Sequence, residues 1–470
     1  RFSQEQSMDV EQACTPRKSS FLAIVQGAAD SYIFLLPLVL MSLTRDMAMR
    51  AIQEANETIT DTSFMNAFNH VPTFPTAAFR GVVNANVDTL YSSAWLDLRQ
   101  EPVVLSLPVK DVGSRFAVMQ MMDFYSNTFA SPRIGDKECA YIVCSKDYAG
   151  PIPAGLQPCR SNTQFVWLLG RIAVHGDADL DAVRQLQGQC HLRPLSSWMK
   201  GGKPTQALRM PASDNPTLAP RDIVQAMDAV TFFTKAAELM GDAAPTADDD
   251  AAGAMSYLNA IGMMPGKSPV FSNKFPRLLA LGFRLGKLRV VLGMVTRTES
   301  VNGWRGISNL AAGAYGTKYV ERAIVAQVGL GANLPVDARY LVWLRLNGAR
   351  VHTLTFSPPP VRAFWAITVY KDGWLVPHPT CAAHVCTISS REPLIVEKQN
   401  GNIVIHMSNQ EPAATTSAGI NWLPLPKGAC SLTARFYDPK EAMHNGEWKM
   451  PKLACHMHQR ACADCFTGIF

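Results

Sequence analysis

The side chains best suited to chemistry lie between residues 84 and 125 of this 470-residue chain. The candidates there are two carboxylates, two phenols and one guanidinium: Asp88, Tyr91, Arg115, Asp123 and Tyr125. Carboxylates and phenols can transfer protons, and a guanidinium can bind an acidic group through paired hydrogen bonds. Gathered in one pocket, they could bind or act on a sugar-like or acidic small molecule. The sequence assigns a catalytic role to none of them individually.

The same segment also has a purely structural interpretation. Asn86, Asp88 and Thr89 are residue types that cap turns, because their short polar side chains bind nearby backbone donors. Tyr91 and Trp95 would then belong to the hydrophobic core. The two interpretations differ in one testable respect. The pocket hypothesis requires the side chains of Asp88, Tyr91, Arg115 and Asp123 to converge in one cavity, since they lie on neighbouring predicted strands and turns.

Other motifs that could carry chemistry either have the wrong spacing or do not occur. Gly262–Ser268 has three residues between its glycines, whereas a phosphate-binding loop needs four. A Gly-x-Ser-x-Gly elbow and a His-Glu-x-x-His helix do not occur. We therefore expect no cofactor and no metal site.

The C-terminal segment 454–470 is rich in cysteine and histidine. Cys455, His456, His458, Cys462 and Cys465 match no standard pair of zinc-binding hooks. We expect at least one disulfide bond among the three cysteines, because it would restrain a terminus that otherwise frays. The chain has 11 cysteines, an odd number, so at least one lacks an intramolecular partner.

Composition limits the possible partners. Hydrophobic residues make up 47% of the chain and charged residues 17%, which indicates folded cores rather than disorder. The net charge of +6 is modest and its basic residues are scattered, so no nucleic-acid partner is expected. A first residue other than Met is consistent with a removed leader, and thus with secretion or an organelle lumen.

An apolar helix is predicted near the N-terminus, after a polar tail at 1–17. Its residues 21–40 have Asp30 at the centre, where a charge would be costly in lipid. We therefore expect a packed helix that ends near Pro37, and no membrane span. This helix and a first β-rich lobe make up the predicted unit 18–200.

The rest of the chain alternates between β-rich and helical patterns. A linker and helical segment is predicted at 201–312, a second β-rich lobe at 313–453 and a tail at 454–470. Short runs bounded by Pro, Gly, Asn and Asp are typical of antiparallel strands. In the first lobe they are predicted at 79–87, 103–109, 115–122, 140–144 and 165–170. In the second lobe they are predicted at 341–346, 350–356, 363–370, 394–397, 402–407 and 431–437. Helices are predicted at 179–191, 220–240 and 275–296.

Two stretches resemble the paired families known as domains of unknown function 1254 and 1214. The first, 66–135, is centred on Asn84–Leu98, which matches the signature PN.DTLYS.AWLDL except that Ala85 occupies the usual Pro position. The second, 314–451, includes Gly329–Asn333, Asn421–Pro424 and Arg435–Tyr437. The resemblance implies an α+β, β-rich fold with two β-sandwich, jelly-roll-like lobes and helices between and around them. It implies no activity.

Two functions remain open from the sequence. The leading hypothesis is that the protein binds or acts on a small molecule or saccharide in a polar-aromatic pocket of the first lobe. The alternative is a non-enzymatic structural or assembly protein, whose β lobes pack with copies of itself or with other proteins. A deep pocket would favour the first, and a large exposed apolar patch the second.

Overall fold

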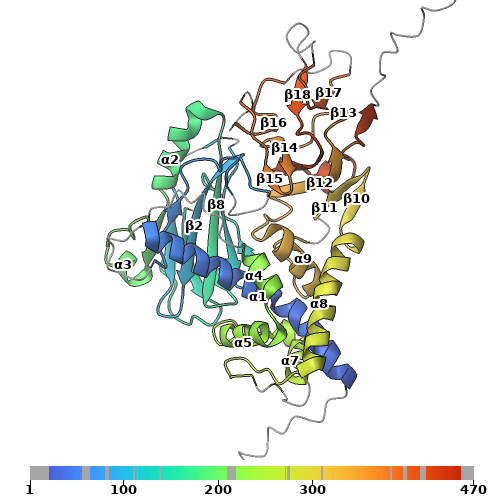
Figure 1. Ribbon diagram of the computed structural model, residues 1–470. Coiled ribbons are helices and arrows are strands. Elements are labelled where there is room, and N and C mark those ends of the chain that lie inside the picture. The colour runs from blue at the N-terminus through green and yellow to red at the C-terminus, as the bar shows by residue number, and fades with distance from the viewer. Residues whose placement is uncertain are drawn as a thin grey trace, which may run out of the picture.

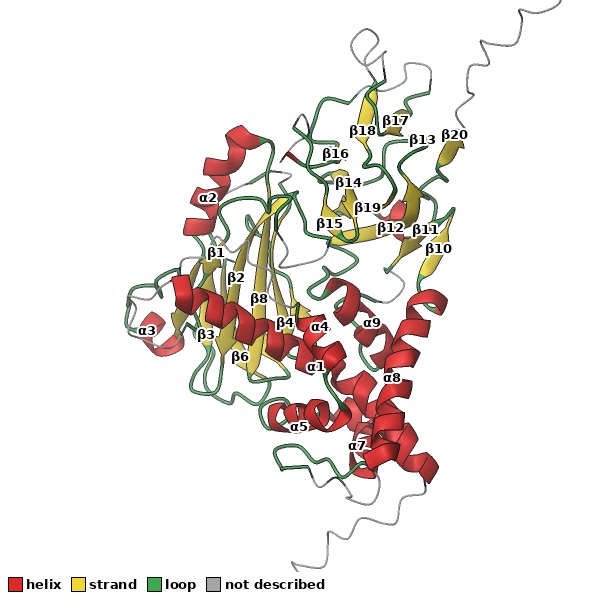
Figure 2. Cartoon of the chain, in the orientation of Figure 1, coloured by secondary structure: helices red, strands yellow, loops and turns green. Residues whose placement is uncertain are grey.

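Two β-sandwich lobes and a layer of helices make up the molecule (Figure 1). The computed structural model describes residues 21–55, 64–79, 84–109, 112–113, 115–136, 139–208, 219–269, 271, 276–307, 311–379, 381, 384–394, 400–412 and 420–456. The lobes lie side by side, and the helices cover the lower side of both (Figure 2). The predicted α+β fold class is confirmed.

The first lobe consists of two sheets with a hydrophobic core between them. Their strand orders are β1-β2-β8-β4-β5 and β7-β6-β3-β9. Successive strands cross between the sheets, as in jelly rolls. Leu105, Val143 and Leu168 are among the side chains that fill the space between them. The elements are β1 (Asn69–His70), β2 (Thr89–Asp97), β3 (Val103–Ser106), β4 (Ala117–Asp123), β5 (Thr128–Ala130), β6 (Ala140–Ser145), β7 (Gln157–Ser161), β8 (Phe165–Ala173), η1 (Asp177–Asp179), α2 (Leu180–Gly188), β9 (His191–Pro194) and α3 (Leu195–Met199).

The predicted strand 79–87 is absent from its described residues, 79 and 84–87, and residues 80–83 lie outside the described part of the chain. Residues 84–88 form a turn, in which Asn86 Oδ1 accepts a hydrogen bond from the backbone N–H of Asp88 at 2.6 Å. Strand β2 begins only at Thr89. The side-chain-capped turn that the sequence indicated for Asn86 is therefore present, and it fixes the start of the strand. The other four predicted strands of the lobe are confirmed.

The second lobe repeats the sandwich plan. One sheet has the order β10-β11-β12-β19-β14-β15, with β16 also paired to β14, and the other has the order β18-β17-β13-β20. Leu354, Ile405 and Leu432 are among the core residues between them. The elements are β10 (Glu299–Val301), β11 (Trp304–Gly306), β12 (Ala338–Asn347), β13 (Val351–Phe356), β14 (Trp365–Lys371), β15 (Trp374–Leu375), β16 (Thr387–Ser389), β17 (Ile403–Ser408), β18 (Asn421–Pro424), β19 (Ala429–Tyr437), α10 (Glu441–His444) and β20 (Ala454–His456). Strands β10 and β11 precede residue 313. The predicted strand 394–397 lies almost wholly outside the described residues.

The helical layer is built around the long helix α1 (Phe21–Ala55). This helix packs against several shorter helices and against the outer face of the first lobe. It continues through Pro37, so the predicted end near that residue is wrong. Every residue from Ser31 to Ser42 is buried, and this burial offsets the hydrogen bond that proline cannot donate. The other helices are α4 (Pro220–Ala226), α5 (Ala229–Leu239), α6 (Ala247–Ala251), α7 (Ala254–Ala260), α8 (Pro276–Thr296) and α9 (Tyr319–Gly329).

Helix α1 is long and apolar enough, by length and composition, to cross a membrane. In this structure 83% of an apolar stretch of 18 of its residues is buried inside the protein. Asp30 pairs with Arg289 of α8 at 2.5 Å, so its charge has a partner within the helical layer. The predicted packed helix is present. That the protein has no membrane span stays a prediction.

The helix predicted over 220–240 is divided in two. Asp228 breaks it, because its side chain accepts a hydrogen bond from the backbone N–H of Thr231 and caps the start of α5. Such a cap satisfies a donor that has no partner within the helix.

None of the eight described cysteines forms a disulfide bond. Cys455 is one of them, and it is exposed on β20. Its predicted partners Cys462 and Cys465 lie outside the described residues, so a bridge in the tail stays a prediction.

His70 should make stability depend on pH. Its Nδ1 lies 2.8 Å from Ser92 Oγ, and its ring stacks on Phe68. Burial, with a smaller contribution from the charge of His191, lowers the pKa of His70 to about 4 from the ordinary 6.5. Between these values the unfolded chain binds more protons, so the stability present above pH 6.5 is lost as the pH falls towards 4.

We expect chemical denaturation at pH 7 and pH 4.5 to show this loss, roughly 2–3 kcal/mol from this one group. His70→Gln should flatten that part of the profile. Superimposable pH profiles for the wild type and the variant would show that His70 is not the source.

Candidate functional site

The register of the first sheet separates the predicted pocket residues. Asp88 immediately precedes the residue that pairs with Ala173, whereas Asp123 pairs with Val166. These two positions of β8 are seven residues apart, about 23 Å along the strand. The predicted convergence in one cavity is therefore wrong, because the strands run the full length of the sheet between the two carboxylates.

Asp88 contacts the second lobe. Its side chain is fully buried, and Arg391 Nη2 donates to its Oδ1 at 2.6 Å. The hydroxyl of Tyr437 donates to Oδ2 at 3.1 Å and accepts a hydrogen bond from Asn86 Nδ2 at 2.9 Å. Arg391 Nη1 also donates to the carbonyl oxygens of Asp88 and Val174. Burial, and then the charge of Asp88, raise the pKa of Tyr437 well above its ordinary value, so the phenol stays a donor.

Arg435 extends this network along the second lobe. Its Nη2 donates to the carbonyl oxygen of Asn84 at 2.9 Å and to the hydroxyl of Tyr370 at 2.8 Å. Tyr370 in turn donates to the carbonyl oxygen of Ala85 at 2.6 Å. The turn 84–88 is thus held by side chains of β14, β19 and Arg391. The signature segment of the first domain therefore meets the Arg435–Tyr437 segment of the second.

Arg115 lies at the same end of the sheet as Asp88 but has a different partner. Its guanidinium donates to both carboxylate oxygens of Asp179, at 2.5 and 2.8 Å. Burial alone would raise the pKa of Asp179, but hydrogen bonds from Arg115 and from the backbone of His175 outweigh it and lower the pKa. The pair therefore fixes η1 to the end of β8.

Tyr91 lies between the two groups. Its ring is beneath the fully buried guanidinium of Arg171, which is 5.3 Å from the ring centroid. Arg171 donates to Gln120 Oε1 at 2.6 Å and to the carbonyl oxygen of Gly331 at 2.5 Å. Tyr91 thus supports a contact between the first sheet and the loop after α9.

Asp123 and Tyr125 form a separate cluster next to the helices. Asp123 Oδ1 accepts hydrogen bonds from the backbone N–H groups of Tyr125 and Asn127, each at 2.9 Å, and so closes a turn. Complete burial raises the pKa of Asp123 despite these bonds. The hydroxyl of Tyr125 donates to the carbonyl oxygen of Ala243, and its ring is 5.0 Å from the buried guanidinium of Arg322.

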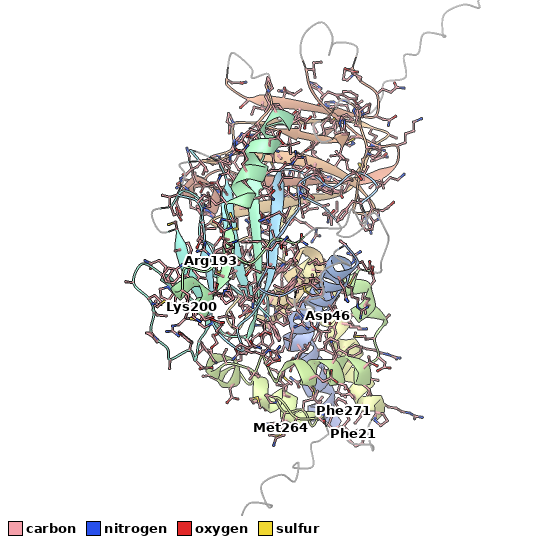
Figure 3. All side chains as sticks on the ribbon, turned by 90° about the vertical axis from the view of Figure 1, so that its left-hand side faces the viewer. Phe21, Asp46, Arg193, Lys200, Met264 and Phe271 are labelled. Carbon is pink, nitrogen blue, oxygen red and sulfur yellow. The ribbon has the colours of Figure 1, made fainter. Side chains whose placement is uncertain are left out.

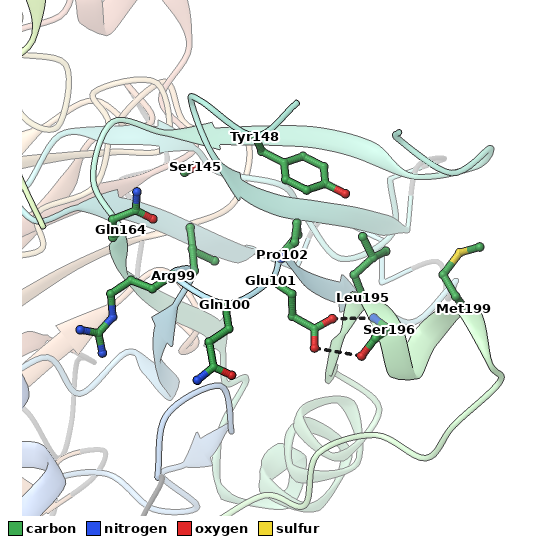
Figure 4. A pocket seen from close by; sticks show the side chains of 11 residues that line it. Arg99, Gln100, Glu101, Pro102, Ser145, Tyr148, Gln164, Leu195, Ser196 and Met199 are labelled. Atoms are coloured by element: carbon green, nitrogen blue, oxygen red, sulfur yellow. Dashed lines mark hydrogen bonds between the residues drawn. The ribbon is translucent and has the colours of Figure 1, made fainter. Parts of the chain in front are cut away.

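A pocket of about 460 Å³ opens at another place in the first lobe, where the second sheet meets α3 (Figure 4). None of the five predicted residues lines it. Its lining comes from the β2–β3 loop, the end of β6 and the turn after it, the residue before β8, and both ends of α3. The lining residues are Leu98, Arg99, Gln100, Glu101, Pro102, Ser145, Tyr148, Gln164, Leu195, Ser196 and Met199.

The charged side chains of this pocket are held by neighbours. Both oxygens of Glu101 accept hydrogen bonds from Ser196, one from its backbone N–H at 2.6 Å and one from its hydroxyl at 2.9 Å (Figure 4). Arg99 Nη2 donates to Asp97 at 2.7 Å, and its guanidinium lies over the ring of Phe165. Hydrogen bonds and the charge of Arg99 outweigh burial and lower the pKa of Asp97. The two opposite charges are therefore fixed in place.

Tyr148 supplies the aromatic surface of the pocket. Its ring lies against Gly150, where an added Cβ would clash with the ring and with its hydroxyl. The turn is held because Arg160 donates to the carbonyl oxygens of Lys146 and Tyr148.

The side-chain amides of Gln100 and Gln164 make no hydrogen bond to the part of the chain that the structure describes. Each amide offers a donor and an acceptor to the pocket. The sequence did not reveal this site, because its residues come from four separate segments and form no motif.

Metal binding finds no support among the described residues, where no group of three His, Cys, Asp or Glu side chains is arranged to hold an ion. His378 and Cys381 come within 3.6 Å of each other, without a third ligand of these types among the residues that are described.

Comparison with known families agrees with the two-lobe organisation. The family "Protein of unknown function (DUF1254)" matches residues 65–194, and "Protein of unknown function (DUF1214)" matches residues 344–441. The chain pairs these two domains in that order, as the sequence predicted.

One solved structure extends the likeness to 92% of the chain. The crystal structure of the VPA0106 protein from Vibrio parahaemolyticus is similar with a TM-score of 0.62 and 21% identity, over 92% of this chain and 100% of that one. A putative uncharacterized protein from Burkholderia cenocepacia gives a TM-score of 0.40 and 11% identity, over 93% and 95%. The first likeness supports the fold. A search of curated proteins found no match.

Proposed function

We propose that the protein binds a small polar molecule of the saccharide class in the pocket of the first lobe. The observation that carries this proposal is the combination of one fixed aromatic ring with two amides that have no described partner. A pocket of about 460 Å³ is within the usual size range for small-molecule sites. The ligand class is the one that the sequence suggested, but the proposed binding residues are different.

The chemistry of the lining fits a sugar. The ring of Tyr148 and the side chains of Pro102 and Leu195 offer apolar surface for the C–H faces of a pyranose. The amides of Gln100 and Gln164 can each bind hydroxyl groups as donor and as acceptor.

Binding fits the geometry better than catalysis does. Glu101 and Arg99 already have hydrogen-bonded partners within the protein, so neither is arranged as a free proton donor or acceptor. They would instead set the polarity of the pocket and favour a neutral or zwitterionic ligand over a strongly charged one.

A thermal-shift screen of the purified chain against monosaccharides, disaccharides and sugar acids tests the proposal. At least one saccharide should raise the melting temperature, because a ligand that binds only the folded state stabilises it. Tyr148→Ala should weaken the binding of that ligand by about tenfold, because it removes roughly 1.4 kcal/mol of contact with the ring. Gln100→Ala should weaken it as well.

Gln185→Ala is the matched control, since Gln185 is exposed on α2, in the same lobe but outside the pocket. It should leave binding unchanged. A saccharide that binds wild type, Tyr148→Ala and Gln100→Ala equally would place its site elsewhere and overturn the proposal.

A further inference from the structure

Helix α8 has two faces of opposite character. Its inward face carries glycines that allow close packing: an added Cβ at Gly282 would come within 2.6 Å of Ala28 Cβ, and one at Gly286 within 2.8 Å of the carbonyl oxygen of Ala29. These contacts also show that α1 and α8 run in the same direction. The glycine face therefore accounts for how α8 is held to the protein.

The outward face carries a stripe of large aliphatic side chains. They recur every three or four positions, so they share one side of the helix. Each is between 38 and 61% exposed: Leu281, Leu285, Leu288, Val291, Leu292 and Val295. From the first to the last, the stripe covers about 21 Å of helix. A helix on the surface of a soluble protein ordinarily turns such a stripe towards the core, whereas this one leaves it in contact with solvent.

The charges on α8 indicate which kind of partner the stripe would bind. The helix has no acidic residue and four basic ones. Arg277 and Arg284 are exposed and make no ion pair with the described residues. Lys287 and Arg289 lie along the two edges of the stripe and bind groups of the protein. A second copy of α8 would bring like charges together, whereas an anionic lipid surface offers opposite charge and an apolar interior.

The apolar surface continues at the neighbouring tip of α1. Phe21 and Leu22 are 67% and 72% exposed. Because α1 and α8 are parallel, these side chains lie near the start of α8, and Phe21 is at the lower end of the molecule (Figure 3). Both helices therefore present apolar side chains at the same end.

We propose that the aliphatic stripe of α8 docks on an anionic lipid surface. The helix lies in the plane of the interface, its leucines and valines enter the boundary between headgroups and acyl chains, and Arg277 and Arg284 bind lipid phosphates. Arg277 and Arg284 are seven residues apart and lie on the same side of the helix as the stripe, so their long side chains can reach the headgroups when this side faces the membrane. The inference is independent of the saccharide pocket, which is in the first lobe.

Flotation of the full chain with vesicles tests the proposal. Vesicles of phosphatidylcholine mixed with phosphatidylglycerol should carry the protein upward, and vesicles of phosphatidylcholine alone should carry several-fold less. The triple variant Leu285→Gln/Leu288→Gln/Leu292→Gln should bind mixed vesicles about tenfold more weakly than the wild type. Leu344→Gln, a change of an equally exposed leucine on β12, is the control and should bind as the wild type does.

Two further measurements keep the result decisive. Arg277→Gln/Arg284→Gln should reduce the preference for anionic vesicles, and Leu288→Trp should show a blue-shifted emission that brominated lipids quench.

Sedimentation of the protein without lipid tests whether the stripe binds a second copy of the chain instead. A wild-type dimer that becomes a monomer in the triple variant would assign the stripe to a second copy and overturn the proposal, as would equal flotation of wild type and triple variant.

Discussion

Replacing Arg391 by alanine is expected to lower the free energy of unfolding by about 3–5 kcal/mol. The guanidinium makes hydrogen bonds to the carboxylate and carbonyl of Asp88 and to the carbonyl of Val174, and Asp88 is fully buried. Its removal leaves a carboxylate inside the protein that, among the described side chains, keeps a hydrogen bond only from the hydroxyl of Tyr437. Chemical denaturation of the purified variant measures the loss, and proteolysis should cut more readily at the boundary between the lobes.

Arg362→Ala is the matched control for this prediction. Arg362 also pairs with an aspartate, Asp438, but its side chain is 61% exposed, so the change should cost less than about 1 kcal/mol. Asp88→Asn/Arg391→Met, which removes both charges, should cost less than Arg391→Ala alone. Equal losses for Arg391→Ala and Arg362→Ala would mean that the buried pair does not hold the lobes together.

A second large loss is expected from Gly282→Ala. The added Cβ would meet the carbonyl oxygen of Val25 and, at 2.6 Å, the Cβ of Ala28. The backbone oxygen cannot move without shifting α1, so the two helices must separate and lose part of the core around them. We expect a loss of about 3 kcal/mol, measured by chemical denaturation.

Gly188→Ala tests whether this effect comes from the close approach of helices. Gly188 is also helical, and beyond its chain neighbours and the backbone of its own helix an added Cβ there would meet no heavy atom of the described chain within 4 Å. Alanine is the better helix former, so this variant should be unchanged or more stable by about 0.5–1 kcal/mol. A comparable loss at both glycines would point to a general cost of alanine rather than to the contact with α1.

Local chemistry made part of the fold predictable. The strands of both lobes are short runs bounded by turn residues, and four of the five in the first lobe lie where the pattern placed them. The error at 79–87 arose because apolar residues there suggested a strand, whereas Asn86 caps a turn and delays the strand until Thr89. The helix end predicted near Pro37 was wrong because burial of the surrounding residues outweighs the hydrogen bond that proline cannot donate.

The candidate site could not be predicted in the same way. Asp88 was predicted to line a pocket, whereas it is buried against Arg391, which is 303 positions away, and no local pattern reports such a pairing. Asp123 seemed close to Asp88 because both lie in one motif-rich segment, although the strands carry them to opposite ends of β8. The pocket of Tyr148 depends on four segments that only the folded sandwich brings together.

A crystal structure of the chain with its best-binding saccharide tests the central claim most directly. The proposal predicts that the sugar lies against the ring of Tyr148, with its hydroxyl groups within hydrogen-bonding distance of Gln100 and Gln164. Arg391 and Asp88 should keep their contact at the lobe boundary. A sugar bound instead at that boundary, with the pocket of Tyr148 unoccupied, would contradict the account.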